Sequence, residues 1–138
     1  MEDAELVLAA NAAFYAAFEM LDADAMARAW SETMPVTCIH PNGALLEGRD
    51  AVMESWRTIF RSTSSIHFVL DDVRAFVAGD AAWVVLNEVI DARHGEAQIS
   101  AAARATNVFT KDASGWKLVH HHAEPPVAAP KRATSVLN

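Results

Sequence analysis

The order of the predicted elements indicates an α+β fold, in which helices cover one face of an antiparallel sheet. Three helical segments come first, within residues 2–21, within residues 22–32 and from Gly48 onward. Strands separated by short turns then occupy residues 66–124. A strongly curved sheet that is covered by helices encloses space. We therefore expect a cavity between its concave face and the helices.

The first helix has the clearest pattern. Apolar side chains recur at helical spacing along residues 2–21 and fall on one face. These positions are Leu6, Ala10, Ala13, Phe14, Ala17, Phe18 and Leu21. Asp22 or Asp24 can cap a second, shorter helix that runs to about Glu32. A third helix begins at residues 48–50 and also carries its apolar side chains on one face.

Turn residues divide the rest of the chain into strands. A short strand at residues 36–40 is closed by Pro-Asn-Gly at residues 41–43. Four longer strands are expected at residues 66–77, 82–92, 97–110 and 116–124. Pro125 and Pro126 end the last strand. We therefore expect one domain over residues 1–126 and a loose tail over residues 127–138.

Composition excludes several classes of function. The 138 residues suit one domain, and the net charge of −7, with 11 Lys and Arg that form no patch, argues against nucleic-acid binding. No apolar run reaches the ~18 residues that a membrane span needs. The acidic N-terminus is unlike a secretory signal, so we expect a cytoplasmic protein. The lone Cys38 is expected to be a small buried hydrophobic residue.

Three consecutive histidines, residues 120–122, end the last strand. Successive strand side chains point to opposite faces, so His121 points one way and His120 and His122 the other. Histidine titrates near neutral pH, which makes these residues candidates for proton transfer or metal binding. His120 and His122 could share a metal with Glu124 or Glu88, but packing or an interface role is favoured, and we expect no metal and no cofactor.

The third long strand has a more apolar odd face, which we expect to point inward. Asn107 is the polar exception on that face. In the last strand, polarity leaves the inward face open, because Trp116 and Leu118 lie on one side and Val119 and Ala123 on the other.

Three strings in the chain are similar to those of the nuclear transport factor 2-like superfamily, within it the SnoaL-like and ketosteroid isomerase-like proteins, and also the calmodulin-dependent kinase II association domain. They are residues 36–41 followed by 48–56, residues 79–83, and residues 105–109 followed by 115–123. The resemblance implies a cone-shaped fold, with three N-terminal helices packed on the concave face of a strongly curved sheet. It also implies a homodimer, since the convex face often makes the dimer contact in this superfamily.

The resemblance further implies which side chains line the cone. The kinase association domain places pocket groups at positions matching Val89, Asn107 and Ala123. Odd-numbered residues would then face inward in three strands. These are Trp83, Val85, Asn87, Asn107, Val119 and His121. The inward faces offer no carboxylate other than Asp91, so the aspartate base of ketosteroid isomerases has no expected counterpart.

We therefore predict a small apolar ligand, a carbonyl compound, in the cone. His40 and His121 are the predicted catalytic residues for isomerisation, cyclisation or dehydration. The predicted ligand-binding residues are Tyr15, Trp30, Trp56, Trp83, Asn87 and Asn107. Asn107, with Tyr15, would stabilise an oxyanion. The alternative is a non-catalytic ligand-binding or dimerisation module, in which these side chains belong to the core.

Overall fold

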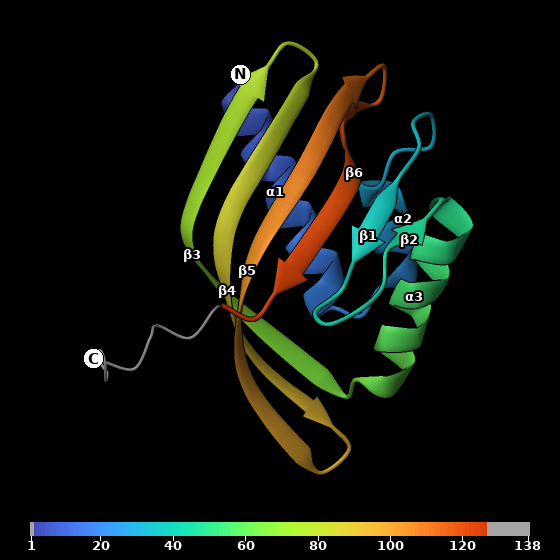
Figure 1. Cartoon of the computed structure of the whole chain (residues 1–138), viewed down its shortest axis with the longest axis vertical. Coiled ribbons are helices and arrows are strands. Elements are labelled where there is room, and N and C mark those ends of the chain that lie inside the picture. Colours follow the sequence, from blue (N-terminus) through green and yellow to red (C-terminus); the bar gives the residue numbers. More distant parts are fainter. Residues whose placement is uncertain (1, 127–138) are drawn as a thin grey trace.

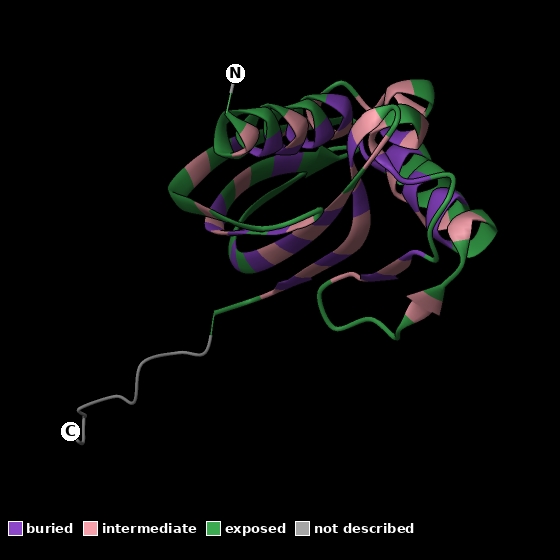
Figure 2. Cartoon of the chain, turned by 90° about the horizontal axis from the view of Figure 1, so that it is seen from above, coloured by how far each residue is buried: buried purple, intermediate pink, exposed green. Residues whose placement is uncertain are grey.

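A six-stranded curved sheet wraps around the first helix in the computed structural model, which describes residues 2–126 (Figures 1 and 2). The helices are α1 (Asp3–Glu19), α2 (Ala23–Ala29) and α3 (Arg49–Ser62). The strands are β1 (Thr37–Ile39), β2 (Leu46–Glu47), β3 (Ser65–Ala78), β4 (Ala81–His94), β5 (Ala97–Asp112) and β6 (Gly115–Glu124). The predicted α+β cone with three helices is confirmed. The tail predicted at residues 127–138 lies outside the described residues.

The sheet order is β2-β1-β6-β5-β4-β3, and two of its features differ from expectation. The two-residue strand β2 was not predicted, and it pairs with β1. The pairing of β1 with β6 is parallel, whereas the prediction was a wholly antiparallel sheet. Because α3 and the strands β3 to β5 lie between β1 and β6 in the chain, there is room for the crossover that a parallel pairing needs.

The helix boundaries follow from local chemistry. At the start of α2, the carboxylate of Asp22 accepts a hydrogen bond from the backbone N–H of Ala25 at 3.0 Å. Gly48 precedes α3 with a φ of +94°, a conformation that favours glycine. On α3, Val52, Met53, Trp56 and Phe60 are buried, as the helical period requires.

The inward face of β4 is the even-numbered face, not the odd one. The β4–β5 turn has two residues, so paired residue numbers sum to an odd value, and Val84 lies opposite Asn107. An odd inward face in β5 therefore requires an even inward face in β4. Trp83 is 40 % exposed and stacks on Phe76 outside the cone, with 5.6 Å between ring centroids.

The expectation that Trp83, Val85 and Asn87 line the cone was therefore wrong. The side chain of Asn87 accepts a hydrogen bond from Arg104 on the outer face at 3.4 Å. The same parity places Asp91 outside and Glu88 inside, where it lies opposite Ala103. The inward carboxylate that the sequence had seemed to lack is thus present.

A β-bulge explains the ambiguous pattern of β6. Phe109 pairs with Leu118, but Val108 pairs with His120, so Val119 is an extra residue in the strand. Trp116 and Leu118 face inward on one side of the bulge, and His121 and Ala123 face inward on the other. The bulge thus gives β6 two inward registers, and Val119, at the bulge, is partly buried against the core.

Aromatic side chains fill the space between α1, α3 and the sheet. Phe14 packs edge-on against Trp56 with 5.5 Å between ring centroids, and Phe18 packs against Phe68 at 4.7 Å. The buried residues lie on the sides of these elements that face one another (Figure 2). Within residues 2–126, no helix is both long enough and apolar enough to cross a membrane.

The side of the sheet to which each residue of β4 points can be tested directly. Leu86 is 3 % exposed and Val89 is 48 % exposed. Leu86→Ala should lower the free energy of unfolding by about 2–5 kcal/mol, because it leaves a cavity. Val89→Ala should change the free energy of unfolding of the single subunit by about 0.5 kcal/mol or less, because its side chain is exposed there. Denaturant unfolding at several protein concentrations would measure both values, and similar large losses would contradict the assigned faces.

Candidate functional site

Five polar side chains form a hydrogen-bonded network inside the apolar cone. They are Asn11, Tyr15, Glu88, Asn107 and His121, and each is between 0 and 3 % exposed. Asn11 and Tyr15 lie one turn apart on α1 and therefore project from the same side of the helix. The other three residues come from adjacent strands, and Asn107 pairs directly with His121.

The hydrogen bonds of the network run in one direction. The hydroxyl of Tyr15 donates to Oε2 of Glu88 at 2.5 Å. The Tyr15 oxygen accepts from Nδ2 of Asn107 at 3.3 Å, and the same amide nitrogen donates to Oδ1 of Asn11 at 2.9 Å. The remaining amide atom, Oδ1 of Asn107, lies 2.5 Å from Nδ1 of His121. Because an amide oxygen only accepts, Nδ1 of His121 carries the proton.

His121 is held in its neutral form. Burial lowers its pKa to about 3, and the charges of His40, His120 and His122 act in the same direction. At neutral pH the imidazole is uncharged and is a weak proton acceptor. At this site the imidazole can form hydrogen bonds, but it is a poor base for abstracting a proton.

Glu88 and Tyr15 have pKa values shifted upward. Burial raises the pKa of Glu88 above 4.5, and the hydrogen bond from Tyr15 opposes the shift. Burial, followed by the charge of Glu88, raises the pKa of Tyr15, so the phenol stays protonated. A carboxyl group whose pKa is raised takes up a proton more readily than an ordinary carboxylate and can release it again.

His40 lies beside His121, as predicted for two residues of one site. Their ring centroids are 6.4 Å apart, and both rings contact Trp56, at 4.8 and 5.8 Å. Ser55 donates its hydroxyl hydrogen to the carbonyl of Val52 at 2.6 Å. Its oxygen therefore accepts from Nε2 of His40, which lies 2.9 Å away. Burial lowers the pKa of His40.

Cys38 also faces inward and lies opposite His121 in the parallel pairing. It is fully buried, and burial raises the pKa of its thiol to about 12. The thiolate that nucleophilic catalysis needs is therefore disfavoured. The expectation that Cys38 is a small buried hydrophobic residue is confirmed.

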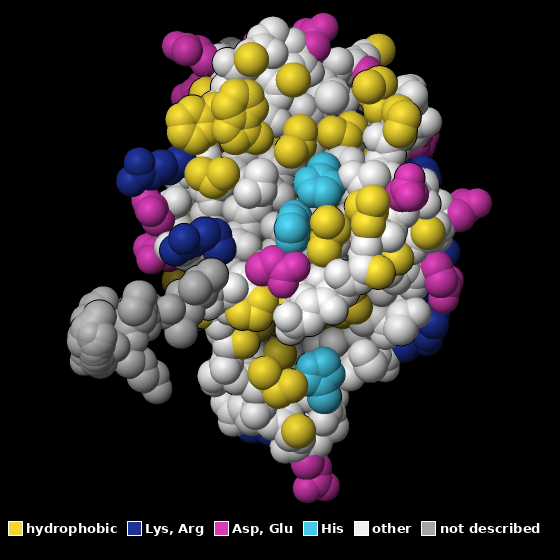
Figure 3. All heavy atoms as spheres, viewed as in Figure 1, with side chains coloured by type: hydrophobic (Ala, Val, Ile, Leu, Met, Phe, Trp, Pro, Cys, Tyr) yellow, Lys and Arg dark blue, Asp and Glu magenta, His cyan; other side chains and the backbone are white. Residues whose placement is uncertain are grey.

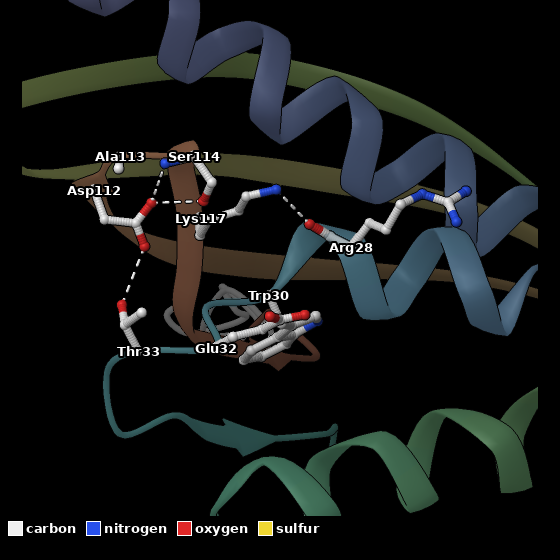
Figure 4. Close-up of a pocket in the computed structure, with 8 residues that line it drawn as sticks. All are labelled: Arg28, Trp30, Glu32, Thr33, Asp112, Ala113, Ser114 and Lys117. Carbon is white, nitrogen blue, oxygen red and sulfur yellow. Dashed lines mark hydrogen bonds between the residues drawn. The ribbon is translucent and has the colours of Figure 1, made fainter.

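Trp30 does not join the network. It lines a cleft of about 540 Å³ between the β5–β6 turn and the segment after α2 (Figure 4). There Lys117 donates to the carbonyl oxygen of Arg28 at 2.7 Å, and Thr33 donates to Asp112 at 3.1 Å. The tryptophans expected to form one aromatic pocket thus occupy separate places, because only Trp56 lies beside His121.

His120 and His122 point to the opposite face of the sheet from His121. Figure 3 shows histidine and hydrophobic side chains together on one face of the molecule. His120 is hydrogen-bonded to Thr37 at 2.7 Å, and His122 to Glu124 at 3.0 Å. Glu88 faces the interior and is no third partner for them, contrary to that alternative. Across residues 2–126, no group of three or more His, Cys, Asp or Glu side chains is placed to hold a metal ion.

Glu88 and Asn11 are the members of the network that sequence reasoning missed. The two-residue turn between β4 and β5 held the signal for Glu88, because it reverses the parity of the inward face. Asn11 carried no such signal, because a polar residue on the edge of an amphipathic helix is usually solvated.

Comparison with known proteins agrees with this architecture. The family model described as the SnoaL-like domain matches residues 7–128. The chain belongs to this family. A crystal structure of a candidate dehydratase of the NTF2-like family from Streptomyces avermitilis has a TM-score of 0.86 and 37 % identity, covering 91 % of this chain and 97 % of that one.

Two further relatives of this SnoaL-like domain belong to other classes of protein. A candidate calcium/calmodulin-dependent protein kinase type II association domain from Thiobacillus denitrificans has a TM-score of 0.74 and 35 % identity, covering 86 % of this chain and 94 % of that one. F-box protein SKIP8 of Arabidopsis thaliana is 31 % identical over 117 residues, which are 85 % of this chain and 48 % of that protein. The chain thus spans about half the length of this curated relative.

The neutral state of His121 predicts a specific pH dependence. Its pKa of about 3 in the folded state lies below the ordinary 6.5, so the unfolded state binds more protons between these values. The contribution of His121 to the free energy of unfolding should be fully present above about pH 6.5 and should be lost as the pH falls toward 3. The expected loss is about 1.4 kcal/mol per pH unit.

Between about pH 6 and pH 4, the free energy of unfolding should therefore change less with pH in the variant His121→Gln than in the unmodified protein. The two slopes should differ by about 1.4 kcal/mol per pH unit. Denaturant unfolding at each pH measures it. Equal slopes in the two proteins would mean that His121 is not a buried neutral histidine.

Proposed function

We propose that this SnoaL-like domain binds a small apolar carbonyl compound in its cone and transfers a proton next to the carbonyl without a cofactor. Glu88 is the proposed proton-transfer group and Tyr15 the proposed hydrogen-bond donor. His121 and His40, the catalytic residues predicted from sequence, take part as uncharged hydrogen-bonding groups. Dehydration, isomerisation and cyclisation all begin with such a proton transfer.

The observation that carries the proposal is an ionisable carboxyl paired with a phenol in an apolar interior. Burying such a group is costly, and apolar replacements of buried charged groups are often neutral or stabilising. A buried acid whose pKa is raised by burial, in a family whose fold is of the pocket type, is therefore better explained by chemistry than by stability.

The proposed chemistry uses the existing hydrogen bonds. The ionised carboxylate of Glu88 takes the proton from the carbon next to the carbonyl, and the electron pair moves to the carbonyl oxygen. Tyr15 turns its hydroxyl from Glu88 to the developing oxyanion. In a dehydration, the electron pair then returns from the oxygen to re-form the carbonyl and make a carbon–carbon double bond. The bond to the leaving hydroxyl breaks, and Glu88 gives its proton to that hydroxyl, which departs as water. The name of the Streptomyces relative, a candidate dehydratase, supports this last variant.

Proton exchange at a ketone tests the proposal before any natural substrate is known. Incubation of the flat ketone 2-tetralone in D₂O would show deuterium entering next to the carbonyl, followed by NMR. We expect acceleration over buffer, lowered about a hundredfold or more by Glu88→Gln. Glu96→Gln, in the exposed β4–β5 turn, is the matched control and should retain the rate.

Unchanged exchange in Glu88→Gln would contradict the role of Glu88. A full loss in His121→Gln, with Glu88→Gln still active, would return the base function to the histidine that the sequence predicted.

A second candidate is a non-catalytic association module, and two observations favour it. The whole network is closed off by Phe14, Phe18 and Trp56, so a ligand enters only when these side chains move. The outer face of the sheet also exposes apolar residues, and its main ones are Val69, Phe76, Trp83 and Val89. The Thiobacillus relative is named an association domain.

We propose a homodimer through this outer face in either case. Trp83→Arg should shift the protein toward monomer in sedimentation, because a charge would be buried in the interface. Leu45→Arg, at a residue 52 % exposed in the loop before β2, is the control and should leave the assembly unchanged. An unchanged dimer in Trp83→Arg would place the interface elsewhere.

A further inference from the structure

We propose that the cone recognises a hydroxyl group on its ligand, through a hydrogen-bond acceptor at Nε2 of His121 that Asn107 and Asn11 set in place. Asn107 and Asn11 are positioning residues in this proposal, since they act through His121. The inference rests on the proposed function only in placing a ligand in the cone, and it specifies the chemistry of that ligand.

The amide of Asn107 can take only one orientation while Tyr15 donates to Glu88. The phenol has one hydrogen, which is engaged at 2.5 Å by Glu88, so its oxygen must accept from the neighbouring amide. Nδ2 of Asn107 meets this need at 3.3 Å and also donates to Asn11 at 2.9 Å. Turning the amide over would bring its oxygen against Oδ1 of Asn11.

The orientation of the amide fixes the tautomer of His121. Oδ1 of Asn107 faces Nδ1 of His121, so the ring proton is on Nδ1 and Nε2 keeps its lone pair. Among the hydrogen bonds within residues 2–126, none uses Nε2 of His121. The imidazole is also uncharged at neutral pH because it is buried near three other histidines. Nε2 is therefore free to accept a hydrogen bond from a ligand.

The indole of Trp56, which lies beside His121, needs a hydrogen-bond acceptor. Trp56 is 1 % exposed, and its Nε1–H has no acceptor among the described residues. Its ring centroid lies 5.8 Å from that of His121. A buried donor without a partner is unfavourable, so a ligand atom that accepts from the indole would stabilise the site. A hydroxyl can donate to Nε2 of His121, whereas a carbonyl or an ether can only accept.

The walls around these two groups define the rest of the ligand. Phe14 lies 5.0 Å from His121 and 5.5 Å from Trp56, ring centroid to ring centroid. Phe18 lies 4.9 Å from Trp56. Aromatic walls favour a flat apolar body. The ligand class is thus a flat ring compound that carries a phenolic or alcoholic hydroxyl.

The tautomer is tested on the protein without any ligand. Nitrogen-15 NMR separates the protonated and unprotonated nitrogens of a neutral imidazole, and the spectrum of His121→Phe identifies the signals of His121. We expect a protonated Nδ1 and an unprotonated Nε2. Asn107→Leu should shift His121 away from this tautomer, while Asn87→Leu, on the outer face of the sheet, should not. A proton on Nε2 in the unmodified protein would overturn the inference.

Ligand selection is tested with a matched pair of probes. Titration calorimetry with 2-naphthol and 2-methoxynaphthalene compares a hydroxyl with an ether on the same ring system. We expect 2-naphthol to bind about tenfold tighter, a difference that one hydrogen bond can supply, and His121→Phe to remove the difference. Equal binding of both probes, or no binding of 2-naphthol, would overturn the inference.

These outcomes are distinct from those of the proton-transfer proposal. Failure of ketone exchange, together with the expected tautomer and a preference for 2-naphthol, would refute catalysis and leave the hydroxyl site standing. Exchange that depends on Glu88, together with a proton on Nε2 of His121, would support catalysis and refute the hydroxyl site.

Discussion

Tyr15 and Glu88 come from opposite walls of the cone, one on α1 and the other on β4, and their hydrogen bond joins the two. With that bond in place, the phenol oxygen becomes an acceptor, the amide of Asn107 takes one orientation, and His121 takes one tautomer. The bond also fixes α1 on the sheet. Rotating or sliding the helix would leave buried polar groups of three residues without partners, at about 1–3 kcal/mol for each group.

The sheet is shaped to hold this network. Small side chains occupy the neighbouring inward positions of β5 and β6, where Ala103 lies opposite Glu88 and Ala105 opposite Ala123. The bulge at Val119 then lets one strand serve two parts of the interior. Its first half contributes Trp116 and Leu118 to the core, and its second half brings His121 to Asn107. A regular strand would have directed His121 or Leu118 outward, because strand side chains alternate.

Sequence reasoning predicted the parts of the site that depend on local periodicity. It placed Asn107 inward from the apolar residues that share its face, whereas the inward direction of His121 followed from the resemblance to the kinase association domain. It failed where the answer depends on how two strands are joined. Trp83 and Asn87 were assigned inward from the match of Val89 to a pocket position of the kinase association domain, without regard to the two-residue turn, and the same error hid Glu88. The bulge in β6 and the crossover that makes β1 parallel arise from tertiary packing, which no pattern within one strand reports.

The central claim is that Glu88 is a buried acid able to exchange a proton at accessible pH. Selective carbon-13 labelling of glutamate carboxyls, with Glu88→Gln to identify the signal, would give its titration curve directly. The account predicts a pKa above 4.5, because burial outweighs the hydrogen bond from Tyr15. A pKa at or below 4.5 would mean that Glu88 is solvated or paired with a cation, and would contradict both the closed network and its proposed role.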